Sequence, residues 1–164
     1  MRSDVDYRLA SLRQLLSIYS EDEINEVFSR FRCSRDLDLE EFLHQRAISY
    51  EKRDLARVYL ALTPDNEIVG YFSLSMRCGI VPKDSRISKS MYKHLNVQSE
   101  TDVAQMYLIG QLGRADGSEN GFGRQLMADA MGLIREANAI IGCPVVRIDC
   151  KPELMEYYTG YGFQ

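Results

Sequence analysis

The chain has no tryptophan, only two histidines and four prolines, and its four cysteines lie far apart. No two cysteines form a C-x-x-C pair, and the two histidines are too few to complete a zinc site with them. This spacing argues against a zinc centre and against a disulfide framework. The cysteines are therefore predicted to be reduced and mostly buried. They are Cys33, Cys78, Cys143 and Cys150.

A long hydrophobic run is also missing. The chain starts with MRSDVDY, which carries charges of both signs, and no apolar segment typical of a secretion signal follows it. The later run LRQLLSIY is too short and too polar to cross a membrane. We therefore expect no signal peptide, no membrane span and a cytoplasmic location.

Neither sign of charge dominates the sequence. The formal net charge of −4 argues against a protein built mainly to coat nucleic acid. One segment is locally basic and contains a single acidic residue, Asp84; its basic side chains are Lys83, Arg86, Lys89, Lys93 and His94. This segment is either a solvated face or a surface that meets a tRNA backbone.

The length of 164 residues indicates one domain, residues 1–164, with a substantial core. Its N-terminal part reads as helices, with a helical extension over residues 1–30. Apolar spacing predicts a first helix over residues 9–19, and Ser20 with Glu23 forms a capping box for a second helix that reaches about Phe31. Asp38 with Glu41 repeats this signal before a third helix.

From residue 56 onward the apolar pattern alternates, which is typical of strands. The turn sequence Pro64-Asp65-Asn66 predicts a hairpin with strands over 57–62 and 68–76. Residues 79–101 look irregular, with a turn of helix at 90–95. The later elements predicted are a strand at 105–112, a helix at 123–139, a strand at 144–150 and a short helix at 152–159. This order is that of an α+β domain with a mixed sheet.

The most informative segment is the glycine turn Gly121-Phe122-Gly123, which lies between a predicted strand and a helix with one apolar stripe. A helix N-terminus there presents unpaired amides and a positive dipole end, and glycine lets an anion approach the backbone. Arg124 in the first turn opposes the dipole unless an external anion offsets it. Glycines also serve turns and close packing, and Arg124 is otherwise simply solvated.

A second element is the pair Tyr157-Tyr158 on the short C-terminal helix. Adjacent helical residues point about 100° apart, so one ring can pack inward while the other faces a cleft. A phenol beside a leaving thiolate can act as a general acid, because its reference pKa of about 10 is close to that of a thiol. The alternative is that both rings only pack.

Together the two elements resemble the GCN5-related N-acetyltransferase (GNAT) family. Its acetyl-CoA motif, Q/R-x-x-G-x-G/A, falls on Ser118 to Gly123, and its later FY-x-x-x-GF element matches residues 157–163. The resemblance covers residues 57 to 164, including the hairpin, the strand–turn–helix unit and the tyrosine element. It implies a mixed, mostly antiparallel sheet flanked by helices, here with extra N-terminal helices and a short C-terminus.

The resemblance also implies acetyl-CoA as cosubstrate and direct attack of a primary amine on the thioester. Tyr158 would protonate the departing thiolate, and a backbone amide near Leu112 would meet the oxyanion. The implied cosubstrate-binding residues are Leu112, Gly113 and Arg114 for the acetyl and pantetheine arm, and Ser118, Asn120, Gly121, Phe122, Gly123 and Arg124 for the pyrophosphate.

Looser motifs resemble the acetyltransferase-toxin branch of this family. They are Phe31-Arg32-Cys33, the run at 39–43, the hairpin at 57–60 and 70–74, and the strand at 108–113. Toxins of that branch acetylate the amino group of aminoacyl-tRNA and are restrained by an antitoxin protein. The resemblance therefore implies an aminoacyl-tRNA acceptor and an antitoxin partner.

The sequence departs from the family pattern in two places. Ser118 stands where Gln or Arg is usual, so one phosphate contact is expected either to be lost or to be taken by Arg114 or Arg124. The chain also stops at Gln164, where the family adds closing strands. Either it is truncated, or a shortened sheet or another chain, such as a second copy in a homodimer, covers that edge.

No general base emerges from the sequence. Gln105 and Gln111 take no proton, and Asp149 is placed on the next strand, where it could face the core. The α-amine of an aminoacyl-tRNA can lose its proton through water, so a missing carboxylate does not exclude catalysis. The alternative function is a non-catalytic CoA-binding or interaction domain with the same fold. A DNA-binding regulator is disfavoured because the N-terminal helices carry an acidic run at 21–26.

Overall fold

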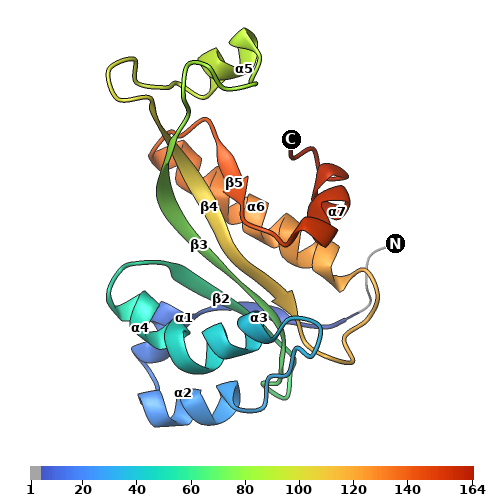
Figure 1. The fold of residues 1–164 in the computed structure, drawn as a ribbon. Coiled ribbons are helices and arrows are strands. Elements are labelled where there is room, and N and C mark those ends of the chain that lie inside the picture. Colours follow the sequence, from blue (N-terminus) through green and yellow to red (C-terminus); the bar gives the residue numbers. More distant parts are fainter. Residues whose placement is uncertain (1–4) are drawn as a thin grey trace.

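The computed structural model describes residues 5–164 and contains one mixed five-stranded sheet in the order β1-β2-β3-β4-β5 (Figure 1). Strands β1 to β4 pair with one another antiparallel, and β5 pairs with β4 in the parallel direction. This confirms the α+β class with a mixed, mostly antiparallel sheet. The strands are β1 (Arg8–Ser11), β2 (Arg57–Leu62), β3 (Ile68–Ile80), β4 (Val103–Arg114) and β5 (Val146–Ile148).

Helices cover both faces of the sheet (Figure 1). The N-terminal helices pack on one face against Leu60, and α6 packs on the other against Phe72 and Ile109. Because side chains alternate along a strand, β2 supplies both cores: Leu60 joins one cluster and Ala61 the other. The helices are α1 (Leu12–Leu16), α2 (Glu21–Phe28), α3 (Leu37–Glu41), α4 (Ala47–Lys52), α5 (Lys89–His94), α6 (Phe122–Ile140) and α7 (Met155–Thr159), with a π-helical turn at Phe42–Arg46 and a 3₁₀ turn at Pro152–Leu154.

The prediction of one helix over residues 9–19 is wrong. Its first part is strand β1, which pairs with β2 so that Leu9 lies opposite Ala61, and only Leu12–Leu16 is helical. The apolar spacing of such a short segment fits both the helical and the strand period. Because the edge of β2 is available for pairing, the segment forms a strand. The capping box of Ser20 and Glu23 is confirmed, although α2 ends at Phe28.

Two further boundaries differ from the predictions. The N-cap of the third helix is Asp36, whose side chain accepts the amide hydrogen bond of Asp38, so the helix begins before the predicted cap. The strand predicted at 144–150 is paired only over Val146–Ile148, because the chain leaves β4 on either side of that stretch. Of the cysteines, Cys33 is buried as predicted, whereas Cys78 is exposed and the remaining two are partly buried.

Strands β3 and β4 form a second hairpin, and both strands are longer than the sequence predicts. The two strands stay paired from Gly70 opposite Arg114 to Ile80 opposite Val103. The basic helix α5 lies beyond the end of the sheet, at the tip of this hairpin, where the Ser88 side chain caps it (Figure 1). Among residues 5–164 no helix is long and apolar enough to cross a membrane.

Candidate active site

The site lies where β4 and β5 separate. Their parallel pairing runs only from Tyr107 opposite Val146 to Ile109 opposite Ile148, while β4 continues to Arg114. A bulge interrupts the pairing with β3 at the same level, since Leu74 faces Ile109 and the next pair joins Ser73 to Gln111. A bulge bends its strand and re-aims the backbone. The last residues of β4 therefore form an open edge that faces a cavity.

This cavity has a volume of about 680 Å³ and receives residues from four parts of the chain. The end of β4, the glycine turn and first turn of α6, the tyrosines of α7, and the segment leading into α3 all contribute to it. Of the ten residues predicted for the site, eight line it: Leu112, Gly113, Arg114, Asn120, Gly121, Gly123, Arg124 and Tyr158. The structure thus places the glycine turn and the tyrosine element on one hollow, although some thirty-five residues separate them in sequence.

The turn geometry explains its glycines. Gly121 is the N-cap of the 19-residue helix α6 and has a φ of 93°, in the left-handed region where a side chain is strained. No side chain caps this helix and no acidic residue stands in its first turn. The positive end of the helix dipole therefore faces the cavity without a protein anion to offset it.

The other two predicted residues do not line the cavity. Phe122 is fully buried and packs edge-on against Tyr7, which fixes the start of α6 on the core. Ser118 holds the loop together: its hydroxyl donates to the Ala115 carbonyl at 2.6 Å and accepts from the Arg114 guanidinium at 3.2 Å. Ser118 therefore positions Arg114, which lines the cavity.

The two tyrosines occupy different environments, as the sequence indicates. Tyr158 is 7% exposed and packs in the α6 core, and its burial, followed by the nearby Tyr157, raises its pKa to about 12. Tyr157 is 40% exposed, and its hydroxyl shares a hydrogen bond of 2.9 Å with that of Tyr161. Both rings line the cavity. A Tyr158 phenol with this pKa stays protonated at neutral pH, as a proton donor must.

Residues that the sequence did not single out close the opposite wall. Arg35 donates to the main-chain carbonyls of Arg114 and Ala115 at 2.9 and 3.1 Å. Lys151 donates to the Asp36 carboxylate at 2.9 Å, which raises the pKa of the lysine. These contacts join positions about 80 and 115 residues apart, and no local pattern marks them.

Asp149 is not free to act as a base in this arrangement. Its carboxylate accepts from Arg147 at 2.6 Å and lies outside the cavity lining. Asp116 accepts the Ser34 amide at 3.0 Å, a bond that lowers the pKa of Asp116 and ties the loop to the N-terminal segment. Among residues 5–164 no group of three His, Cys, Asp or Glu side chains is placed to hold a metal ion.

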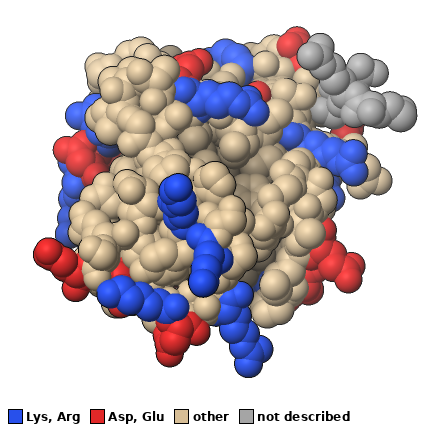
Figure 2. All heavy atoms as spheres, turned by 90° about the horizontal axis from the view of Figure 1, so that it is seen from above, with Lys and Arg blue, Asp and Glu red and all other residues tan. Residues whose placement is uncertain are grey.

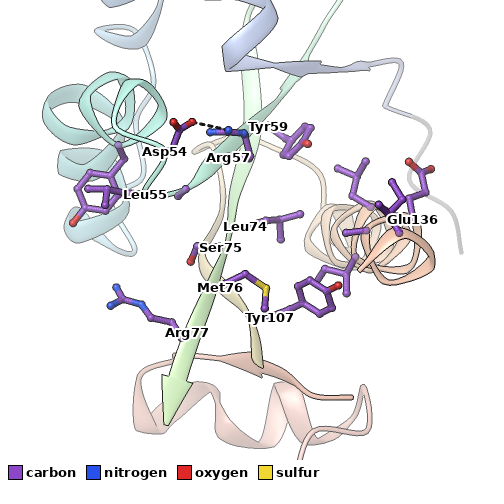
Figure 3. A pocket seen from close by; sticks show the side chains of 16 residues that line it. Asp54, Leu55, Arg57, Tyr59, Leu74, Ser75, Met76, Arg77, Tyr107 and Glu136 are labelled. Atoms are coloured by element: carbon purple, nitrogen blue, oxygen red, sulfur yellow. Dashed lines mark hydrogen bonds and ion pairs between the residues drawn. The ribbon is translucent and has the colours of Figure 1, made fainter. Parts of the chain in front are cut away.

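A larger hollow of about 830 Å³ lies elsewhere, between the α4–β2 connection, β3 and the C-terminal half of α6 (Figure 3). Its floor is mainly apolar, with Tyr59, Leu74 and Tyr107 directed toward α6. Arg57 and Asp54 on its rim form an ion pair at 2.7 Å and thus neutralise each other. This hollow lacks the helix N-terminus, and the hydroxyl of its buried tyrosine, Tyr107, donates to the Ile141 carbonyl, so the smaller cavity is the better candidate for chemistry.

The chain has the fold of known acetyltransferase toxins. It superimposes on AtaT complexed with acetyl-methionyl-tRNAfMet with a TM-score of 0.74, at 20% identity over 97% of this chain and 87% of that one. A Tyr-to-Phe mutant of KacT gives 0.73 at 19% identity over 96% and 86%. A mutant of AtaT bound to the C-terminus of the antitoxin AtaR and acetyl-CoA gives 0.68 at 18% identity over 96% and 84%.

These likenesses confirm the GNAT fold implied by the sequence resemblance. At such low identity they establish the architecture alone. No family model matches the sequence, and no curated protein matches it.

Proposed function

We propose that this chain is an acetyl-CoA-dependent N-acetyltransferase that acts on the amino group of aminoacyl-tRNA. The observation that carries the proposal is the single cavity shared by the uncapped N-terminus of α6, the open edge of β4 and the Tyr158 phenol. An anion site, a strand edge without a neighbouring strand and a proton donor are what a CoA thioester requires of a protein. In this role acetyl-CoA supplies an activated acetyl group for direct attack by an amine.

Each part of the cavity fits one part of this cosubstrate. The turn at Asn120 to Gly123 would bind the pyrophosphate through main-chain amides and the helix dipole, assisted by Arg114 and Arg124. The open edge from Leu112 to Arg114 would hydrogen-bond the pantetheine arm as a neighbouring strand does, because β5 has left that edge vacant.

Two groups would carry the chemistry. A main-chain amide near Leu112 would stabilise the negative charge that develops on the carbonyl oxygen. Tyr158 would give its proton to the departing sulfur, which prevents reversal of the transfer. The raised pKa of Tyr158 keeps the proton in place until a thiolate forms beside it. No protein base is needed if the amine loses its proton to water.

The acceptor and the partner follow from the structural neighbours and from charge. AtaT has been seen with acetyl-methionyl-tRNAfMet and with the antitoxin AtaR. In this chain the basic side chains of the hairpin tip are exposed, and Figure 2, which looks down on that end, shows Lys and Arg across the face with acidic side chains nearer its outline. We therefore include a tRNA acceptor and an antitoxin partner in the proposal, and a cytoplasmic location, where charged tRNA and acetyl-CoA occur.

The test has two stages. Isothermal titration of the full chain with acetyl-CoA should show saturable binding, and the absence of binding at high micromolar concentration would remove the proposal. Incubation with acetyl-CoA and a mixed pool of aminoacyl-tRNA should then release free thiol and block the α-amine. Binding without transfer to any amine would instead favour the non-catalytic CoA-binding domain.

A further inference from the structure

Asp36 and Lys151 place a carboxylate–ammonium pair in the wall of the catalytic cavity. The Lys151 ammonium donates to Asp36 Oδ1 at 2.9 Å, and both residues line the same hollow as Tyr158. The Asp36 side chain is only 18% exposed, whereas that of Lys151 is 43% exposed. A carboxylate that already holds a primary ammonium therefore faces the space where an amine must react.

The Asp36 carboxylate is held rigidly. Its Oδ1 also accepts the Asp38 amide at 3.2 Å as the N-cap of α3. The helix behind it is anchored twice on the sheet, since Tyr71 donates to the Leu39 carbonyl at 2.6 Å and the Leu39 side chain fills the space above Gly113. A preorganised carboxylate binds a ligand without the entropy loss of ordering it.

Lys151, in contrast, is a long side chain on a loop and has no second strong acceptor. Its other acidic neighbours are Asp38, which lies at 3.8 Å and is 78% exposed, and the exposed Glu153. An ammonium on a flexible stem can leave its partner when another ammonium takes its place. The Lys151 ammonium thus marks the position that an acceptor's ammonium can occupy.

Asp36 and the proton donor Tyr158 line the same cavity. Two nearby carboxylates are engaged elsewhere, Asp116 by Ser34 and Asp149 by Arg147, whereas Glu153 lines the cavity as an exposed side chain without the cap that holds Asp36. The titratable groups around Asp36 are Cys33, Asp38, Tyr71, Lys151 and Tyr158, and the same cavity is also lined by Arg35, Arg114, Arg124, Glu153 and Tyr157.

The geometry points to Asp36 as the binding site for the ammonium group of the acceptor, which displaces Lys151 from it. This inference rests on the proposed function. In the step that follows, the bound ammonium loses a proton to water, the nitrogen bonds to the acetyl carbon, and the carbon–sulfur bond breaks while the nitrogen releases its second proton to water and becomes the amide. The leaving sulfur takes the Tyr158 proton, which solvent restores. Asp36 touches the acceptor, and Lys151 acts only as its competitor.

Replacing Asp36 and replacing Lys151 should therefore change the acceptor KM in opposite directions. An ion pair that only stabilised the structure would give the same direction for both replacements. Kinetics with a mixed aminoacyl-tRNA pool, at saturating acetyl-CoA, should show that Asp36→Asn raises the acceptor KM about 10-fold, the size of one charge-assisted hydrogen bond. Lys151→Met should lower the acceptor KM, because it removes the competitor. Asp38→Asn is the matched control: it removes an exposed carboxylate beside the same lysine and should change KM by less than about twofold.

The pH profile gives a second readout. A carboxylate beside the bound ammonium raises the pKa of that ammonium, so the acidic limb of kcat should move to lower pH in Asp36→Asn. Asparagine still caps α3, and an unchanged acetyl-CoA affinity verifies the fold of the variant. If that affinity is lost, Lys151→Met decides alone, and an unchanged or higher KM overturns the inference.

Failure of the inference can be told from failure of the proposed function. Wild-type protein that neither binds acetyl-CoA nor releases thiol would overturn both. Active wild-type protein with an Asp36→Asn variant of equal KM and equal pH profile would overturn only the role of Asp36. A higher acceptor KM in both Asp36→Asn and Lys151→Met would show that the ion pair has only a structural role.

Discussion

A Cβ atom on Gly123 would stand 3.0 Å from the hydroxyl oxygen of Tyr157, so α7 rests directly on the first turn of α6. This close approach brings the tyrosine element to the helix N-terminus and defines the width of the cavity between them. The hydrogen bond of Tyr157 with Tyr161 holds the hydroxyl at that place. The glycine is therefore required by packing as well as by the approach of an anion.

The first prediction concerns this contact. Gly123→Ala should push the Tyr157 hydroxyl outward and reduce access to the α6 amides, weakening acetyl-CoA binding about 10-fold by isothermal titration. Gly132→Ala in the same helix is the control, since a Cβ there meets nothing within 4 Å. That variant should keep its affinity and gain about 0.5–1 kcal/mol of stability from helix propensity. Equal affinity in both variants would contradict the assignment.

Tyr158→Phe should lower turnover by about 10²- to 10⁴-fold, the usual contribution of a general acid, with little change in acetyl-CoA affinity. Thiol release in reactions quenched at set times gives the turnover rate, and isothermal titration gives the acetyl-CoA affinity. Tyr157→Phe removes the neighbouring hydroxyl, which is already bonded to Tyr161, and should retain most of the activity. A fully active Tyr158→Phe protein would exclude the phenol from proton transfer.

The ionisation of Tyr158 predicts how stability changes at alkaline pH. Burial raises its pKa to about 12 from an unfolded value of 10.0, so the unfolded chain ionises first as pH rises. The contribution of this phenol is complete below pH 10 and is lost between pH 10 and 12. Urea unfolding at pH 8 and pH 11 should therefore show a smaller loss of stability in Tyr158→Phe than in the wild type. An equal loss in both proteins would disagree with this.

The site was partly readable from sequence because its main elements are local. The strand β4, the turn at Gly121 and the helix α6 form a continuous segment whose glycines and apolar stripe carry their own signals. Asp36 and Lys151 carry none, because they lie 115 residues apart and meet only in the folded chain. Phe122 is the converse case: the motif predicts it as a binding residue, but its side chain is buried in the core.

The same limit applies to the N-terminal elements. Ser20 and Glu23 formed the expected capping box, since capping depends on residues three apart. Leu9 to Ser11 became a strand because β2 offered an edge about fifty residues away, which no local pattern reveals. The structure thus differs from the sequence-based predictions, in the fold and in the site, where residues far apart in sequence come into contact.

A stability prediction concerns Glu51, a carboxylate that is 2% exposed. It accepts the Val58 amide at 2.8 Å and pairs with Arg57 at 3.1 Å, which joins α4 to the start of β2. Glu51→Ala leaves the buried Val58 amide without its acceptor, while Arg57 keeps its pair with Asp54, so unfolding in urea should show a loss of about 2 kcal/mol. Glu51→Gln keeps one acceptor oxygen and should lose less. A loss under about 1 kcal/mol in the alanine variant would contradict the assigned role.

The basic hairpin tip predicts the salt dependence of tRNA binding. Lys89 and Lys93 are exposed on α5, remote from the cavity. If they contact phosphates, replacing both with alanine should weaken tRNA binding and reduce the slope of log K against log salt by about 1 to 2. Acetyl-CoA affinity should not change, which separates the tip from the cavity. Lys52→Ala, at an exposed lysine that pairs with Glu21 on the N-terminal helices, serves as the control and should leave the slope as it is. An unchanged slope in the α5 variant would assign tRNA contact to another surface.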